Sequence, residues 1–113
     1  MIVQEIVDIL QSKVVAGSAK IDNEISSGYV SDLLSNVMGQ AKIGSVWITM
    51  QGHQNIVAVA SLLGLSAVIL AGDVQPEKET VSKAEEEQIP LLTTNLSSFA
   101  AAGLLHDKGI QGV

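Results

Sequence analysis

The fold is decided by residues 46–70, which read VWITMQGHQNIVAVASLLGLSAVIL. The β-branched and aromatic run at 46–50 predicts a buried strand, and the apolar run at 67–70 predicts a second one. Between them, residues 56–63 predict a helix that stops at Gly64. Two buried strands joined by a helix indicate a right-handed crossover and a parallel sheet.

The same alternation of strands and helices extends to both sides of this unit. On the carboxyl side we expect a turn at Gly72-Asp73, a helix from Pro76 to Glu87, a strand at 89–93, an exit loop at 94–97 and a helix at 98–105. On the amino side we expect a helix at 2–10, a strand at 13–16 ending at Gly17, a loop at 18–24 and a strand at 25–30. The next helix is expected to start after a cap at Asp32, to run through Met38 and to end at Gly39. Trp47 is expected in the core, and Phe99 with Ala102 and Gly103 is expected to form a thin helix face for close packing on the sheet or on another subunit.

These elements predict an α/β fold with three layers, α/β/α, and a mostly parallel, Rossmann-like sheet of about five strands. We expect residues 1–113 to form a single domain, because 47% apolar and only 16% charged residues suffice for a core of that size. The absence of cysteine excludes disulfides and thiolate chemistry and is compatible with the reducing cytoplasm. The start of the chain has no basic region typical of a secretory signal. The apolar stretch 56–71 is shorter than the roughly 20 residues of a membrane-spanning helix.

The charge balance excludes one class of partner. Twelve acidic residues against six lysines give a net charge of −6, and arginine is absent. Such a surface repels phosphate backbones, so we expect no nucleic-acid partner. Without arginine, an anionic ligand has to be held by backbone N–H groups, hydroxyls, amides or lysine.

Four loops are the candidate binding site, because ligands of parallel sheets bind beyond the carboxyl ends of the strands and near helix N-termini. They are rich in glycine, hydroxyl and amide groups, and their candidate residues are Gly28, Tyr29, Ser31, Asp32, Thr49, Gln51, Gly52, His53, Gln54, Asn55, Gly72, Asp73, Thr93, Thr94, Asn95 and Ser97. We expect the four loops to converge on one pocket. The structural alternative is that Asp32, Asn55 and Ser97 cap helices and the glycines only turn the chain.

Other chemistry finds little support in the sequence. His53 follows a glycine at a strand-to-helix exit and could act as an acid or base, but no second histidine or carboxylate accompanies it. His106 suits the carboxyl end of the last helix. Two histidines without cysteine make a zinc site improbable, and the consecutive carboxylates at 85–87 point in different directions on a helix. No P-loop, dinucleotide fingerprint or nucleophile elbow occurs, so we expect no cofactor and no kinase activity.

The region from about 28 to 110 resembles the DRTGG family, through Gly28-Tyr29-Val30-Ser31-Asp32-Leu33-Leu34-Ser35, Val46-Trp47-Ile48-Thr49, Gly52-His53-Gln54-Asn55-Ile56-Val57-Ala58-Val59-Ala60 and the run from Lys83 to Thr94. The resemblance implies a regulatory domain. Related domains are attached to phosphotransacetylases and to CBS-domain proteins, and the amino-terminal domain of HPr kinase/phosphorylase is similar. Stand-alone versions that resemble this chain occur near iron-only hydrogenase subunits.

The chain departs from the motif that names this family. Residues 52–55 lie where type members have glycine, aspartate, arginine and a small polar residue, and residues 71–73 lie where they have a pair of glycines. The ligand served by that aspartate and arginine therefore cannot be carried over to this sequence.

Three hypotheses about function follow. The first is a homodimeric regulatory domain that senses a small metabolite or nucleotide-like anion, is not self-sufficient in catalysis and reports to a partner protein. The second is a protein-interaction or scaffold domain without a small ligand, associated with a redox or hydrogenase complex, and an apolar surface patch would favour it. The third is an enzyme that uses His53, which requires an acid or amide within hydrogen-bonding reach of the imidazole.

Overall fold

A five-stranded sheet forms the centre of the computed structural model, which describes residues 1–113, and its strands lie in the order β1-β5-β4-β3-β2. The strands are β1 (Lys13–Ala16), β2 (Ser27–Val30), β3 (Ser45–Thr49), β4 (Ala67–Leu70) and β5 (Leu91–Thr93). Strands β2 to β5 run parallel, whereas β1 pairs antiparallel with β5. The predicted mostly parallel sheet is confirmed, with one antiparallel strand at its edge.

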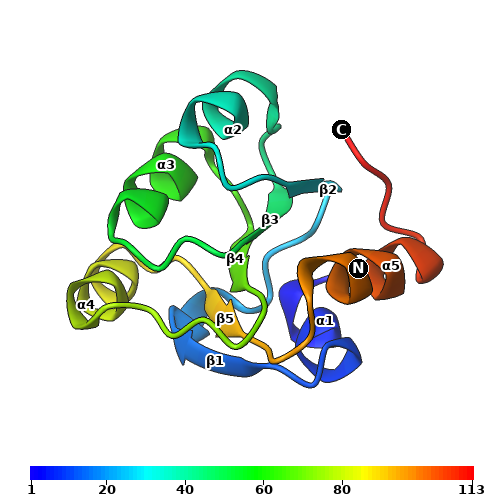
Figure 1. The fold of residues 1–113 in the computed structure, drawn as a ribbon, viewed down its shortest axis with the longest axis horizontal. Helices are drawn as coiled ribbons and strands as arrows, with labels where there is room; N and C mark the ends of the chain where they lie inside the picture. The colour runs from blue at the N-terminus through cyan, green and yellow to red at the C-terminus, as the bar shows by residue number, and fades with distance from the viewer.

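Five helices cover the two faces of this sheet. They are α1 (Val3–Ile9), α2 (Leu34–Gln40), α3 (Asn55–Leu63), α4 (Lys78–Glu87) and α5 (Ser98–Asp107), and a short 3₁₀ turn spans Ser18–Lys20. Helices α2, α3 and α4 lie on one face, and α1 and α5 lie on the other (Figure 1). The predicted three-layer α/β/α architecture is therefore confirmed.

Successive side chains of each strand point to opposite faces of the sheet, which divides the core into two halves. In β3, Val46 and Ile48 pack toward α1 and α5, whereas Trp47 packs toward α2, α3 and α4. All three side chains are buried, as a central strand covered on both faces requires. The Trp47 indole N–H donates a hydrogen bond of 2.8 Å to the carbonyl of Ser31, so its one polar atom is satisfied.

The path of the chain singles out one place at the carboxyl edge of the sheet. The connections from β2 to β3, from β3 to β4 and from β4 to β5 all pass through helices on the same face. After β5 the chain crosses to the other face and forms α5. The segments that leave β4 and β5 therefore diverge to opposite faces, which is the topology that opens a crevice in such sheets.

Several element boundaries differ from the sequence prediction. Helix α2 begins at Leu34 rather than at a cap on Asp32, because the Asp32 carboxylate is engaged elsewhere, and Gly39 lies inside this helix. Pro76 precedes the start of α4 by two residues instead of opening it. Strand β5 begins at Leu91 rather than at residue 89.

The expectation that Phe99 and Gly103 pack on the sheet was wrong, whereas packing of this face on another subunit stays a prediction. Phe99 is 91% exposed, and a Cβ built on Gly103 would meet nothing within 4 Å. The helix packs on the sheet through Ala101 and Leu105 instead, with Ala102 partly buried. The large aromatic side chain therefore lies on the solvent side of the helix.

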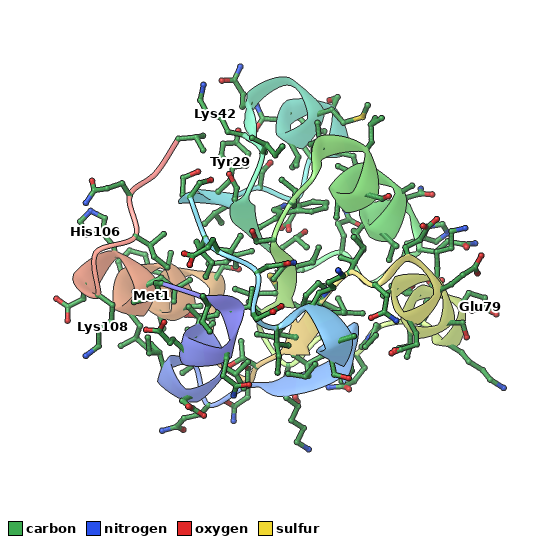
Figure 2. All side chains as sticks on the ribbon, turned by 180° about the vertical axis from the view of Figure 1, so that it is seen from behind. Met1, Tyr29, Lys42, Glu79, His106 and Lys108 are labelled. Atoms are coloured by element: carbon green, nitrogen blue, oxygen red, sulfur yellow. The ribbon has the colours of Figure 1, made fainter.

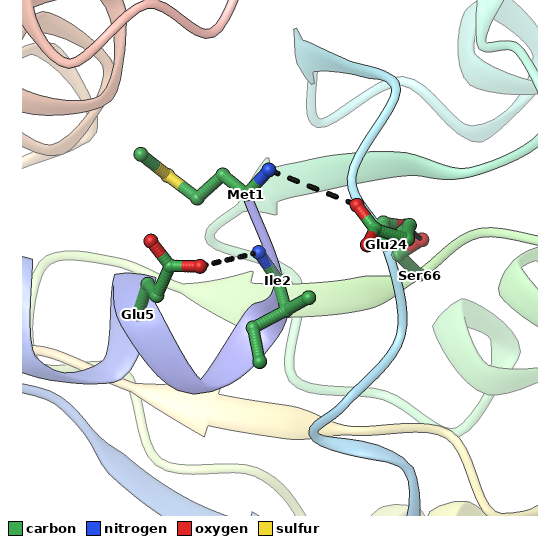
Figure 3. A network of polar contacts seen from close by, with 5 residues as sticks. All are labelled: Met1, Ile2, Glu5, Glu24 and Ser66. Carbon is green, nitrogen blue, oxygen red and sulfur yellow. Dashed lines mark hydrogen bonds and ion pairs between the residues drawn. The ribbon is translucent and has the colours of Figure 1, made fainter.

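Contacts near the amino terminus fix α1 to the loop before β2 (Figure 3). The Met1 ammonium lies 3.7 Å from the Glu24 carboxylate, and the Ile2 N–H donates a hydrogen bond of 3.1 Å to Glu5 Oε1. The Ser66 hydroxyl donates to the Glu24 carbonyl, which ties the same loop to the segment before β4. These contacts hold α1, and the turn that leads from it into β1, against the sheet.

Candidate functional site

A polar cavity of about 460 Å³ lies at the point where the chain diverges after β4 and β5. Three segments line it, namely the turn into β1 with β1 itself, the loop after β4, and the end of β5 with its exit loop. Only one lining residue is apolar, and the set is Gln11, Lys13, Val15, Asp73, Gln75, Thr93, Thr94 and Asn95. The cavity thus occupies the crevice in which parallel sheets bind their ligands.

The antiparallel direction of β1 brings a lysine to this edge. Lys13, the first residue of β1, pairs with Thr93, the last residue of β5. Side chains two residues apart on a strand share a face. Val15 packs with the core half under α2, α3 and α4, so the Lys13 side chain lies on that same face of the sheet. Lys13 takes part in none of the ion pairs of the protein, which involve Met1 and Lys83. Its ammonium group is therefore available to a ligand.

Hydrogen bonds between the three segments hold the rim of the cavity in place. The Gly72 N–H donates to the Leu96 carbonyl at 2.7 Å, and the Asp73 N–H donates to the Thr94 carbonyl at 3.0 Å. The Thr94 hydroxyl donates to the Leu10 carbonyl at 3.0 Å, which fixes the exit loop of β5 to the end of α1. The cavity is consequently formed without a ligand, as most small-molecule sites are.

Two lining residues adopt a backbone conformation that L-residues rarely take. Gln11 has φ of 49° and Asp73 has φ of 61°, and the third such residue in the chain, Gln88, ends α4. A left-handed conformation costs a residue with a Cβ roughly 1–2 kcal/mol, and glycine avoids this cost. Gln11 directly follows the end of α1, as Gln88 ends α4, and a left-handed residue is common at such a position. Asp73 is the one of the three that lies in a loop after a strand.

The structure divides the predicted binding residues into separate groups. Asp73, Thr93, Thr94 and Asn95 line the cavity. The expectation that all four loops border one pocket was wrong, because no residue of the loops after β2 and β3 lines the cavity. The loop after β2 contacts the loop after β3, which in turn contacts the segment before α4. Ser97 accepts a hydrogen bond of 3.1 Å from the Ala100 N–H, so it caps α5, as the structural alternative expected.

Asp32 is the residue that joins the loops after β2 and β3. Its carboxylate accepts hydrogen bonds from the Thr49 hydroxyl at 2.8 Å and from the Met50 N–H at 2.7 Å. The Gln51 side-chain amide donates to the Asp32 carbonyl at 3.1 Å. Because these groups satisfy one another, they are occupied in the folded protein without any ligand.

His53 contacts backbone rather than another side chain. It is exposed, and its Nδ1 accepts a hydrogen bond of 3.1 Å from the N–H of Asn55, the first residue of α3. The structure gives its imidazole no hydrogen bond to an acid or amide side chain, which the enzyme hypothesis required. His53 therefore serves the start of α3 in the way that a capping residue does.

The remaining predicted residues do not line the cavity, although Gly52 lies against the backbone of Gln75. The Gly52 carbonyl accepts a hydrogen bond from the Thr80 hydroxyl, and the Ser31 hydroxyl accepts one from the Leu33 N–H. The Gly28 N–H donates to the Gln111 carbonyl, and the Tyr29 hydroxyl donates to Asn36 Oδ1. Gln54 is exposed beside α4. Figure 2 shows Tyr29 near α2, on the side of the sheet away from α1.

Sequence reasoning missed Gln11, Lys13, Val15 and Gln75. Three of these belong to β1 or the turn before it, and they reach the site only because β1 runs antiparallel to its neighbour. One signal was present, because Lys13 is a charged residue that opens an otherwise apolar strand. The direction of a strand cannot be inferred from that signal alone.

No group of three or more His, Cys, Asp or Glu side chains lies close enough together to hold a metal ion. No helix combines the length and the apolar character that crossing a bilayer requires.

Comparisons with known proteins identify related domains. The model of the DRTGG domain family matches residues 5–107. Among solved structures, the chain resembles the CBS and DRTGG domains of the regulatory region of Clostridium perfringens pyrophosphatase, complexed with its activator diadenosine tetraphosphate. The TM-score is 0.73 and the sequence identity is 22%, and the alignment covers 90% of this chain and 44% of the pyrophosphatase chain. No curated protein sequence matches at a significant level.

Proposed function

The chain belongs to the DRTGG domain family, and from this premise we propose that it is a regulatory domain that binds a small metabolite or nucleotide-like anion. The ligand lies at the carboxyl ends of β4 and β5, in the polar cavity beside Lys13. Binding changes the stability and surface of this edge of the domain, and this change alters the affinity of the domain for a partner protein. The domain acts by binding and not by catalysis of its own.

The observation that carries this proposal is a preformed polar cavity containing a lysine without an ion-pair partner. Its volume of about 460 Å³ falls within the range of small-molecule sites, roughly 300–1,000 Å³. Threonine hydroxyls and side-chain amides line the same cavity and offer both donors and acceptors. The regulatory region of the pyrophosphatase, which shares the fold, is itself complexed with an activator.

A thermal-shift screen of the purified chain tests the proposal. The panel contains small carboxylates, amino acids, inorganic phosphate, acyl phosphates, coenzyme A and nucleotides. A ligand at about a hundred times its dissociation constant adds roughly 2.7 kcal/mol to the free energy of unfolding, which is readily measured in a domain of this size.

Two variants make this screen specific for the cavity. Lys13→Gln should reduce the stabilisation to about half, whereas His53→Gln should leave it intact because His53 lies in a loop that does not line the cavity. A panel without any stabilising compound, or a response lost in His53→Gln but kept in Lys13→Gln, would contradict the proposal.

An apolar surface over α2 and α3 favours a second function, which is association between two copies of this chain. A groove of about 270 Å³ between the helices is lined by Leu34, Met38, Asn55, Ala58, Val59 and Leu62. Leu62 is 70% exposed, and Leu33, Met38 and Ile43 are also exposed nearby. Contiguous apolar surface of this kind marks interaction sites.

The charge distribution supports a second copy as the partner of this apolar surface. From residue 33 to residue 65 the chain contains a single charged side chain, Lys42, which Figure 2 shows beside α2. Two copies with a net charge of −6 each repel one another elsewhere, and this uncharged region lets them meet without opposing like charges. Exposed Leu62 beside a groove also suits a symmetric contact, in which each copy provides both a projection and a recess.

Sedimentation velocity of the purified chain tests this association. We expect a dimer that Leu62→Asp converts to a monomer. Phe99→Asp is the control, because Phe99 is also apolar and exposed but lies on α5, on the other face of the sheet. A wild-type chain that remains monomeric at high concentration, or a dimer that Phe99→Asp disrupts instead, would contradict this second function.

A further inference from the structure

We infer that the ligand of the polar cavity is a zwitterion with the head group of an amino acid, whose carboxylate faces Lys13 and whose ammonium faces Asp73. This inference rests on the proposed function and specifies the small metabolite, rather than the nucleotide-like anion, as its ligand. It concerns free amino acids or dipeptides that carry a polar side chain.

The two charged side chains of the cavity have opposite sign, and neither has an ion-pair partner in the protein. Lys13 and Asp73 both line the cavity, yet neither belongs to an ion pair, so the Lys13 nitrogen and the Asp73 oxygens lie more than 4.0 Å apart. The Asp73 carboxylate receives only a long contact of 3.4 Å, from the Gln75 amide. A ligand that carries one negative and one positive group satisfies both side chains at once.

The neutral part of the lining suits the body of such a ligand. The side chains of Gln11, Thr93 and Asn95 line the cavity, and the side-chain hydrogen bonds of this region run through Thr94 and Gln75 instead. Amides and hydroxyls both donate and accept hydrogen bonds, so they match a polar side chain or a peptide group better than an apolar one. The volume of about 460 Å³ leaves room for such a body beyond the charged head group.

The same lining is unfavourable for a polyphosphate nucleotide. Several phosphate charges would meet one lysine and one carboxylate, and the chain has no arginine to bind phosphate in a bidentate way. The lining also has no aromatic side chain on which a base could stack. The balanced pair of charges therefore selects a ligand without net charge.

The test is isothermal titration calorimetry of the full chain with a panel of defined compounds. The zwitterions are L-glutamine, L-asparagine and glycyl-L-glutamine. N-acetyl-L-glutamine lacks the ammonium group, L-glutaminamide lacks the carboxylate, and ATP, diadenosine tetraphosphate and inorganic phosphate represent phosphate ligands. We expect at least one zwitterion to bind, and its two charge-deleted analogues to bind about tenfold more weakly or not at all.

Two variants assign each charge of the ligand to its partner. Asp73→Asn keeps the shape and tolerates φ of 61°, and it should weaken the zwitterion about tenfold while leaving N-acetyl-L-glutamine unchanged. Lys13→Gln should weaken the zwitterion by a similar factor while leaving L-glutaminamide unchanged. A merely structural role would lower the affinity for every compound equally.

The outcomes separate this inference from the proposed function. Binding of phosphate compounds that depends on Lys13, with no binding of any zwitterion, would overturn the inference and leave the regulatory site in place. Binding of no compound at all would overturn both. Zwitterion binding that neither variant weakens would place the ligand elsewhere and overturn the inference.

Discussion

Among single residues, Gly17 has the environment that least tolerates a side chain. Its φ is 72°, and a Cβ added there would lie 2.2 Å from the Ile89 carbonyl oxygen and 2.3 Å from the carbonyl carbon. These are backbone atoms that cannot rotate away. The sequence indicated that a strand ends at this glycine, but the close approach of residue 89 depends on the pairing of β1 with β5, which lies far away along the chain.

Gly17→Ala should lower the free energy of unfolding by at least about 2 kcal/mol, because left-handed strain and a backbone clash add together. Gly103→Ala is the control, because that position is open and lies inside α5, and it should raise stability by about 0.5–1 kcal/mol. Urea denaturation measures both changes. Equal stability of Gly17→Ala and the wild type would refute the backbone geometry described for this turn.

The strained residues at the cavity allow a second prediction about single positions. Gln11→Gly and Gln88→Gly each remove a Cβ from a left-handed residue, and each should change the free energy of unfolding by about 1 kcal/mol or less. Gln88→Gly should be the less stable of the two, because it also removes the hydrogen bond from the Gln88 amide to the Glu85 carbonyl. Only Gln11→Gly should weaken ligand binding, because Gln88 lies at the end of α4 and outside the cavity. Thermal denaturation and calorimetry measure the two effects, and an equal loss of affinity in both variants would count against the site.

At the scale of elements, Asp32 couples two neighbouring strand exits. Sequence reasoning placed it as a helix cap, because an aspartate before a helix usually caps it. The structure shows that its carboxylate reaches across to Thr49 and Met50 at the end of β3. Such a contact depends on the lateral pairing of β2 with β3, and no local pattern reveals it.

Asp32→Ala should destabilise the domain by about 1–3 kcal/mol, because the buried Thr49 hydroxyl and the Met50 N–H lose their acceptor. Amide hydrogen exchange at Met50 should accelerate. Asp22→Ala removes the same charge from an exposed position without side-chain hydrogen bonds, and it should leave both quantities nearly unchanged. A similar loss of stability in both variants would show that charge, and not this contact, is responsible.

Local patterns predicted the helices and strands because periodicity and glycine positions are properties of short segments. The strands at 13–16 and 67–70 and the start of α5 at Ser98 agree with the structure to the residue. The direction of β1 and the crossing of the chain after β5 are properties of the assembled sheet. Half of the cavity lining was therefore predictable as the loops after β4 and β5, whereas the contribution of β1 was not.

At the scale of the whole molecule, an acidic protein combines an uncharged surface over α2 and α3 with a polar cavity beyond β4 and β5. The apolar surface over α2 and α3 lies on the same side of the sheet as α4, whose preceding loop borders the cavity. Self-association through that surface brings two bodies with a net charge of −6 together, so rising ionic strength should strengthen it by screening their repulsion. Sedimentation at low and physiological salt measures this, and a weaker dimer at higher salt would indicate an interface held by ion pairs instead.

The central claim is that the ligand binds where the chain diverges after β4 and β5. The most direct measurement is a titration followed by ¹H–¹⁵N correlation spectra of the uniformly labelled chain, with the compound that gives the largest thermal shift. We predict that the largest chemical-shift changes fall on the residues that line the cavity, namely Gln11, Lys13, Val15, Asp73, Gln75, Thr93, Thr94 and Asn95. Changes confined to residues 52–55, or to the surface of α2 and α3, would contradict the account and move the site to the loop after β3 or to the apolar face.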